Sequence, residues 1–131
     1  MSVNRIELRS PNYEGVQLDK TDIAADKSKG DLYIYRGKPG FLFTDLKKNP
    51  ADLTISNPES LLVIDADEVE MPKTSAQAFT ATDLVYVNLS TSEATTSSSG
   101  TVLVGRATKD AAASDASVFV RWNQSISGEV S

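Results

Sequence analysis

Short stretches in which apolar and polar residues alternate, separated by turn-forming residues, recur along this 131-residue chain from Gly30 onward. In DLYIYRG, Leu32 and Ile34 fall on one face of a strand and Tyr33 and Tyr35 on the other, because successive side chains of a strand point to opposite faces. Both faces of this strand are apolar. A period of two sustained over many short runs favours strands over helices.

The same period predicts further strands in the first half of the domain. They lie in FLFTDL, which follows the turn GKPG, in ADLTIS, which places Leu53 and Ile55 together, and in ADEVEM. In the last of these, Val69 and Met71 share one face, and we expect Glu68 and Glu70 on an opposite, solvated face.

The second half repeats the pattern. DLVYVNLS and GTVLVGRA flank the polar stretch TSEATTSSSG, which predicts a hairpin with a long solvated connection. In SVFVRW, Val118, Val120 and Trp122 share one face, so we expect Trp122 to be buried, while Phe119 and Arg121 point the other way. Helix is limited to a short turn in TSAQAF. These elements predict an all-β fold, a small antiparallel β-barrel or sandwich.

A chain of this length forms one domain, and we divide it into three segments. Residues 1–29 have no sustained period and are expected to form an extended N-terminal arm, residues 30–124 the barrel or sandwich, and residues 125–131 a short C-terminal tail. The alternative for the first segment is a disordered tail, which would need fewer apolar residues. We expect the arm to lie against a partner through Ile6, Leu8, Tyr13 and Val16.

Composition restricts the possible functions. The chain has no cysteine and no histidine, which removes disulfides, thiolate metal sites and most hydrolase mechanisms. Its 13 Lys and Arg against 18 Asp and Glu give a net charge of −5, which disfavours nucleic acid as a partner. Apolar runs are too short to span a bilayer, and MSVNRIELRS is unlike a secretory signal, so we expect no membrane partner and synthesis in a host cytoplasm.

Three features that suggest chemistry have simpler explanations. The acidic run IDADEVE lacks the glycine and the closing glutamate of a calcium loop, and its carboxylates sit on no evident sugar-binding cleft. Lys73 has no neighbouring cation to activate it and is expected to be an exposed charge at a turn. Asn88, in the sequon NLS, is expected to end a strand. We therefore predict no catalytic residue, no cofactor and no metal site.

Three aromatic residues lie opposite predicted core faces: Tyr33, Tyr35 and Phe119. Such residues are enriched where one protein surface buries another. Burial on both sides of a closed barrel or sandwich explains them equally well. In either case, we expect their rings to be covered.

A series of short motifs occurs in a defined order along residues 30–124: Gly30-Asp31, FTDL, Val69-Glu70, Pro72-Lys73, Asp83, Val85-Tyr86, Val104-Gly105, Ala107, Val118, Val120-Arg121 and Asn123. This order resembles that of the capsid decoration, or cement, proteins of tailed phages, which are small proteins encoded near the major capsid protein. The chain departs from that pattern at Val87, where tryptophan is common, and at Thr82, where glycine is frequent.

The resemblance implies a non-enzymatic, all-β virion protein that binds the outer surface of an assembled capsid and stabilises it. It implies the major capsid protein as partner and a homo-oligomer, most commonly a trimer, although decoration proteins also occur as dimers and monomers. The expected capsid or subunit contacts are Ile6, Leu8, Tyr13, Val16, Tyr33, Tyr35 and Phe119. The alternative is a virion-associated adhesion or fibre-tip module whose Ser/Thr-rich loops bind a host surface.

Overall fold

A computed structural model of the protein describes residues 5–48 and 59–123. These residues form an all-β fold with one short 3-10 helix. The elements in chain order are β1 (Glu7–Leu8), β2 (Tyr13–Asp19), η1 (Lys20–Asp22), β3 (Leu32–Tyr35), β4 (Lys38–Leu42), β5 (Glu59–Pro72), β6 (Leu84–Asn88), β7 (Ala94–Thr95), β8 (Thr101–Ala107) and β9 (Ser117–Trp122). None of the described residues forms a helix long and apolar enough to cross a membrane.

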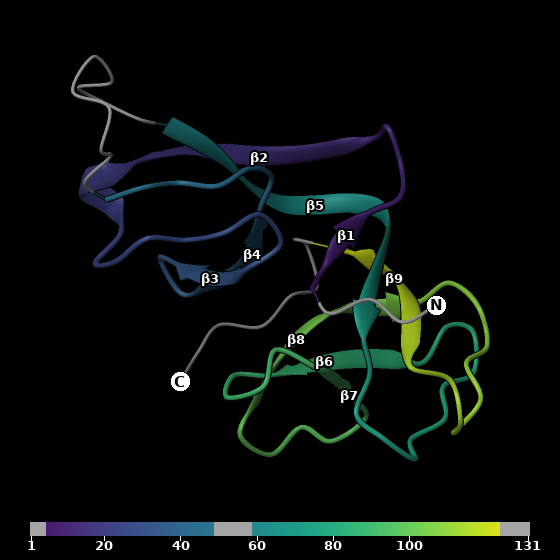
Figure 1. The fold of residues 1–131 in the computed structure, drawn as a ribbon. Helices are drawn as coiled ribbons and strands as arrows, with labels where there is room; N and C mark the ends of the chain where they lie inside the picture. The colour runs from purple at the N-terminus through teal and green to yellow at the C-terminus, as the bar shows by residue number, and fades with distance from the viewer. Residues whose placement is uncertain (1–4, 49–58, 124–131) are drawn as a thin grey trace.

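The long strand β5 organises the sheet (Figure 1). Along one edge it pairs with β2 and then with β1, and along the other with β4 and then with β9, all antiparallel. The β9 register shifts between Ala66 and Val69, which marks a bulge in the middle of β5. Bulges bend and twist a strand, so the first part of β5 can pair with β2 and β4 while the second part pairs with β1 and β9 in another direction.

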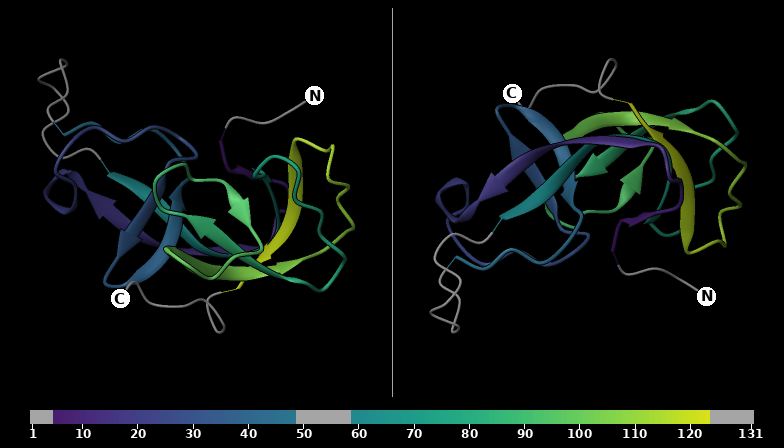
Figure 2. Two further views of the ribbon diagram at one scale, coloured as in Figure 1. Left: turned by 90° about the horizontal axis from the view of Figure 1, so that it is seen from below. Right: turned by 90° about the horizontal axis from the view of Figure 1, so that it is seen from above.

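The other strands extend the sheet in both directions from β5. The strand order is β3-β4-β5-β9-β8-β6-β7, and every pairing between named strands is antiparallel. The sheet curls on itself in the two views of Figure 2, giving a half-barrel. The prediction of a small antiparallel barrel or sandwich is confirmed.

Two apolar clusters fill the space inside and beside the curled sheet. The larger draws on β4, β5, β6, β8 and β9, and in it Trp122 is fully buried, with its ring edge-on to Phe41 at 5.2 Å between centroids. The smaller contains Leu18, Ile23, Leu42, Leu46 and Leu62. The predicted inward face of the last strand is thus confirmed, because Val118 and Val120 are buried beside Trp122.

Strand β3 contacts both clusters. Leu32 and Ile34 pack against the larger one, while Tyr33 and Tyr35 pack against the smaller one. The two apolar faces read from DLYIYRG are therefore real, and each face has a core of its own. The turn between β3 and β4 consists of Arg36 and Gly37, both with positive φ. Of the predicted turn GKPG, only Gly37 belongs to it, and the other three residues lie in β4.

The segment expected to form an N-terminal arm is part of the sheet as far as the structure describes it. Between residues 5 and 29 the chain contributes β1 and β2, which pair with β5, and it buries Ile6, Leu18 and Ile23 in the two clusters. Within the described residues, the sheet therefore extends across the predicted boundary at residue 30. The alternation of β2 is weak because an edge strand buries few side chains; the extra residue at the register shift opposite Glu14 and Gly15 is Ile64 of β5.

Other sequence predictions had mixed outcomes. The hairpin of DLVYVNLS and GTVLVGRA is present as β6 and β8, and their connection holds the short strand β7. FLFTDL forms a strand only as far as Leu42, whereas TSAQAF forms a short turn, as predicted. The strand predicted in ADLTIS lies outside the described residues.

Candidate functional site

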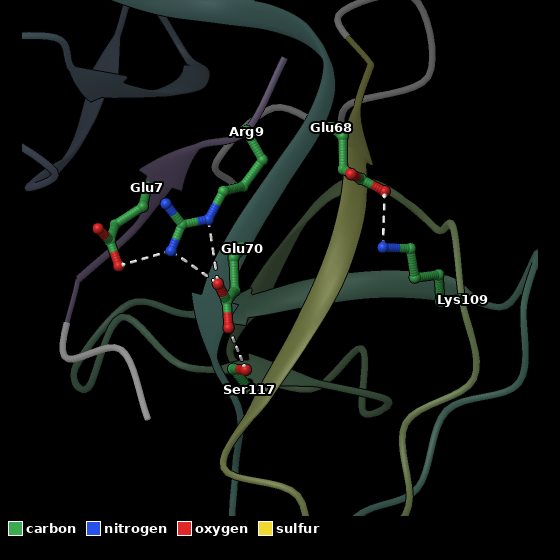
Figure 3. A network of polar contacts seen from close by, with 6 residues as sticks. All are labelled: Glu7, Arg9, Glu68, Glu70, Lys109 and Ser117. Carbon is green, nitrogen blue, oxygen red and sulfur yellow. Dashed lines mark hydrogen bonds and ion pairs between the residues drawn. The ribbon is translucent and has the colours of Figure 1, made fainter. Parts of the chain in front are cut away.

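Charged side chains form a network over the outer face where β1, β5 and β9 run side by side (Figure 3). Just after β1, Arg9 donates to one carboxylate oxygen of Glu70, from Nε at 3.1 Å and from Nη2 at 2.8 Å. The hydroxyl of Ser117, on β9, donates to the other oxygen at 2.7 Å. Glu7 also pairs with Arg9, at 3.3 Å. Glu70 therefore joins three strands.

Glu70 is only 8% exposed, which corrects the expectation of a solvated glutamate. Alternation along β5 placed its side chain away from the larger cluster, as predicted, but Arg9 and Ser117 cover it there. The Ser117 hydroxyl and the Arg9 guanidinium lower the pKa of Glu70 by stabilising its ionised form, and burial opposes them. In turn, the hydrogen bonds to Glu70 raise the pKa of Arg9.

The other carboxylates of IDADEVE also have cationic or hydrogen-bonding neighbours. Glu68 accepts from the Thr108 hydroxyl at 2.8 Å and lies 3.8 Å from the Lys109 ammonium. Asp65 and Asp67 both pair with Arg121. In the described part of the chain, no group of three or more acidic side chains is placed to hold a metal ion.

Lys73 is buried, at 4% exposure, which corrects the expectation of an exposed charge. Its ammonium donates to the backbone carbonyls of Thr74 at 3.3 Å, Ala113 at 3.3 Å and Gln77. Backbone oxygens from two loops far apart in sequence therefore satisfy all three of its protons. Lys73 fastens one loop to the other.

Hydrogen bonds join the three segments that follow β5, β6 and β8. These segments are residues 73–83, 89–100 and 108–116. Phe79 and Ala111 exchange two backbone hydrogen bonds of 2.8 Å between the first and third loops. The side-chain Oε1 of Gln77 accepts from the Thr95 hydroxyl at 3.0 Å, joining the first and second loops. Asn88 ends β6 as predicted, and its Oδ1 accepts from Ser90 N at 2.8 Å to begin the second loop.

The residues predicted to make contacts do not gather in one place. Ile6 is 2% exposed inside the protein's own larger cluster, so it cannot also anchor an arm on another protein in this conformation. Leu8 and Val16 are half-buried against the larger and the smaller cluster, respectively. The remaining three aromatic rings, all half-buried, are Tyr33, Tyr35 and Phe119.

Tyr13 remains exposed, and its ring stacks on that of Phe43 with 5.3 Å between centroids. Phe43 was not singled out from the sequence. In FLFTDL, Phe43 is the third consecutive apolar residue, which was the only sign that it differs from an ordinary strand residue. Because Tyr13 lies 30 residues earlier in the sequence, the pairing of the two rings could not be predicted. Each phenylalanine or tyrosine ring that stays in water leaves apolar area available for a partner.

The described residues thus form a curled sheet whose strands and loops are joined by hydrogen bonds and ion pairs. A family model described as phage cement protein matches residues 55–122, more than half of the chain. The chain belongs to the phage cement protein family. No curated protein and no solved structure gave a match.

Cement proteins are structural proteins that stabilise phage capsids, so a role in the virion capsid follows from family membership. The matched segment spans β5 to β9 and includes Glu70, Lys73 and Ser117, which hold strands and loops together. Strands β1 to β4 and the Tyr13–Phe43 stack lie before the matched segment.

Proposed function

We propose that this protein binds the outer surface of an assembled phage head by contacting the major capsid protein, and that it stabilises the head without catalysing a reaction. The single observation that carries the proposal is the cement-protein match over residues 55–122. The alternation of strand residues and the absence of cysteine and histidine agree with a structural role.

The stabilisation is a binding equilibrium. A protein that binds the assembled lattice, and binds free capsid subunits poorly, shifts the equilibrium toward the lattice by mass action. The hydrogen bonds that tie the three end loops together suit this role, because a surface ordered before binding loses less conformational entropy when it docks.

We further propose that the protein acts on the head as a homo-oligomer, a trimer. Tyr33, Tyr35 and Phe119 are candidates for its subunit contacts, since each ring is covered only in part by its own chain. Leu8 and Val16 are candidates for the capsid face on the same ground. We do not propose Ile6 as a contact, because its side chain is buried in its own chain.

The direct test is a titration of the purified protein onto expanded heads that lack it. We expect saturable binding, a copy number comparable to that of the major capsid protein, and heads that release DNA at a higher temperature once decorated. Cryo-electron microscopy of the saturated heads would show density on the outer surface. Heads that bind no protein overturn the proposal.

Copy number also separates this function from the alternative of an adhesion or fibre-tip module. The exposed serines and threonines of the loop at residues 89–100 are the feature that suggested host binding. A few copies per virion, located at the tail, would support adhesion and contradict decoration.

A further inference from the structure

A groove with an apolar floor runs between the end of β4 and the first strand, β1. Its lining includes Ile6, Leu8, Phe41, Leu42, Phe43 and Thr44. Ile6, Phe41 and Leu42 are nearly fully buried and form the floor, whereas Phe43 is 36% exposed and stands at the rim. We call this feature the aromatic groove.

The rim of the aromatic groove carries the largest exposed apolar side chains of its region. Phe43 stacks on Tyr13, which is 37% exposed, with the ring planes 24° apart. Among the described residues only two other large apolar side chains are as exposed, Leu84 and Leu89, and neither lines this groove. A paired aromatic rim beside an apolar floor is typical of the anchor regions of protein interfaces.

Among the described residues, the cations that line the groove differ in their partners. Arg9 is bonded to Glu7 and Glu70, and the Asp45 carboxylate accepts from the backbone N–H of Lys29 at 2.7 Å. The Lys29 ammonium has no hydrogen bond or ion pair within residues 5–48 and 59–123, and Lys29 is exposed. A ligand that carries a carboxylate beside apolar side chains would complement this lining.

We propose that the aromatic groove binds a segment of the major capsid protein in which apolar side chains lie next to an aspartate or glutamate. The apolar side chains of the capsid segment lie over the floor and pack against the Phe43 and Tyr13 rings, and the carboxylate of the capsid segment pairs with Lys29. This inference rests on the proposed function, and it adds which face of the protein docks and what chemistry that face recognises.

The test compares Phe43, which lines the groove, and Tyr13, which stacks on it, with residues of similar exposure that lie elsewhere. Phe43→Ser and Tyr13→Ser remove rim rings, and Leu84→Ser and Leu89→Ser remove side chains of similar exposure elsewhere. Affinity for expanded heads is measured by titration, and thermal unfolding confirms that each variant folds. We expect the rim variants to bind about tenfold more weakly or worse, and the Leu variants to stay within about twofold of the wild type.

The charge is tested separately. Lys29→Glu places a like charge opposite the proposed carboxylate, so we expect binding about tenfold weaker, while Lys29→Arg retains wild-type affinity. A photo-crosslinking residue in place of Phe43 should attach to a capsid protein segment that contains Asp or Glu. The same residue in place of Leu84 should not form that adduct.

The outcomes distinguish the two proposals. If wild-type protein binds heads and the rim variants bind equally well, the groove assignment is wrong and the decoration function stands. If Phe43→Ser instead alters the oligomeric mass of the free protein in sedimentation, the groove is a subunit interface and the assignment to the capsid is also wrong. If wild-type protein does not bind heads, both proposals fail.

Discussion

The guanidinium of Arg9 donates two hydrogen bonds to a single carboxylate oxygen of Glu70, 61 residues further along the chain. This pair fastens the start of the chain to the central strand, since Arg9 directly follows β1 and Glu70 lies within β5. The other carboxylate oxygen accepts from Ser117 on β9. The ionised side chain of Glu70 thus holds β1 and β9 in register on the two edges of β5.

The first prediction concerns pH. Because the folded protein lowers the pKa of Glu70, its ionised form stabilises the fold above the ordinary pKa of 4.5, and this contribution is lost as pH falls through the lower folded value. Glu70→Gln should therefore reduce the free energy of unfolding by about 1–2 kcal/mol at neutral pH. As the pH falls below the lowered pKa of Glu70, we expect the stabilities of the wild type and the variant to converge.

Denaturant titration at several pH values measures this difference. Glu14→Gln is the matched control, because Glu14 is an exposed glutamate of β2, and we expect it to change stability by less than about 0.5 kcal/mol throughout. A Glu70→Gln effect that stays constant from neutral to acid pH would show that the carboxylate charge does not contribute in the way described.

The second prediction concerns Lys73. Lys73→Met keeps an unbranched side chain but leaves the carbonyls of Thr74, Gln77 and Ala113 without their ammonium donor. We expect a loss of about 1–3 kcal/mol in the free energy of unfolding. Amide hydrogen exchange should accelerate at residues 73–79 and 111–116 first. Lys47→Met, at a lysine 61% exposed, is the control and should have little effect; similar exchange in both variants would contradict the prediction.

The third prediction concerns two glycines. A β-carbon on Gly105 would lie 1.7 Å from the backbone oxygen of Arg121, on the adjacent strand β9, so Gly105→Ala requires the two strands to separate. We expect a loss of about 3 kcal/mol or more. Gly100→Ala meets open space and should cost about 1 kcal/mol, for its positive φ alone. Equal stability of the two variants in denaturant titration would mean that β8 and β9 are not this close.

Much of the fold was predictable because strand alternation is a local signal. The faces of β3 and β9 were assigned correctly from residues within each strand, such as Tyr33 and Trp122. The length of β5 was not predicted, because its bulge between Ala66 and Val69 interrupts the alternation. Val69, Glu70 and Met71 are consecutive buried residues, which no period-two pattern gives.

The polar and aromatic sites were less predictable because their partners are distant in sequence. Lys73 was expected to be exposed because it follows a proline at a predicted turn and has no neighbouring cation, yet the carbonyl of Ala113, to which it donates, comes from a loop 40 residues away. Phe43 gains its significance only from Tyr13, which stacks on it. Sequence spacing alone cannot bring such pairs together.

The fourth prediction concerns the larger cluster. Trp122 is fully buried, and its indole N–H donates to the carbonyl of Pro39 at 3.3 Å, so Trp122→Ala should cost about 3–5 kcal/mol. Trp122→Phe keeps most of the apolar contact but loses this donor, and we expect about 1–2 kcal/mol. Both are measured by denaturant titration. A loss below about 1 kcal/mol for Trp122→Ala would contradict the burial of this ring.

The last prediction concerns the start of the chain. Deleting residues 2–18 removes β1 and all but the last residue of β2, together with the buried side chains of Ile6 and Leu18, and it leaves one edge of β5 unpaired. We therefore expect the truncated chain to lose cooperative thermal unfolding, as measured by circular dichroism, because it loses part of both apolar clusters. An independent arm would behave in the opposite way: its removal would leave the melting temperature unchanged.

Point variants in β2 make the same test without truncation. Leu18→Ala should cost about 2–5 kcal/mol, whereas Gln17→Ala, at an exposed position of the same strand, should cost less than about 0.5 kcal/mol. The contrast follows from the alternation of β2, in which Leu18 faces the smaller cluster beside Leu62. If both variants and the truncated chain melt within a few degrees of the wild type, β1 and β2 contribute little to the stable sheet, and residues 1–29 must be assigned to an arm that acts on a partner.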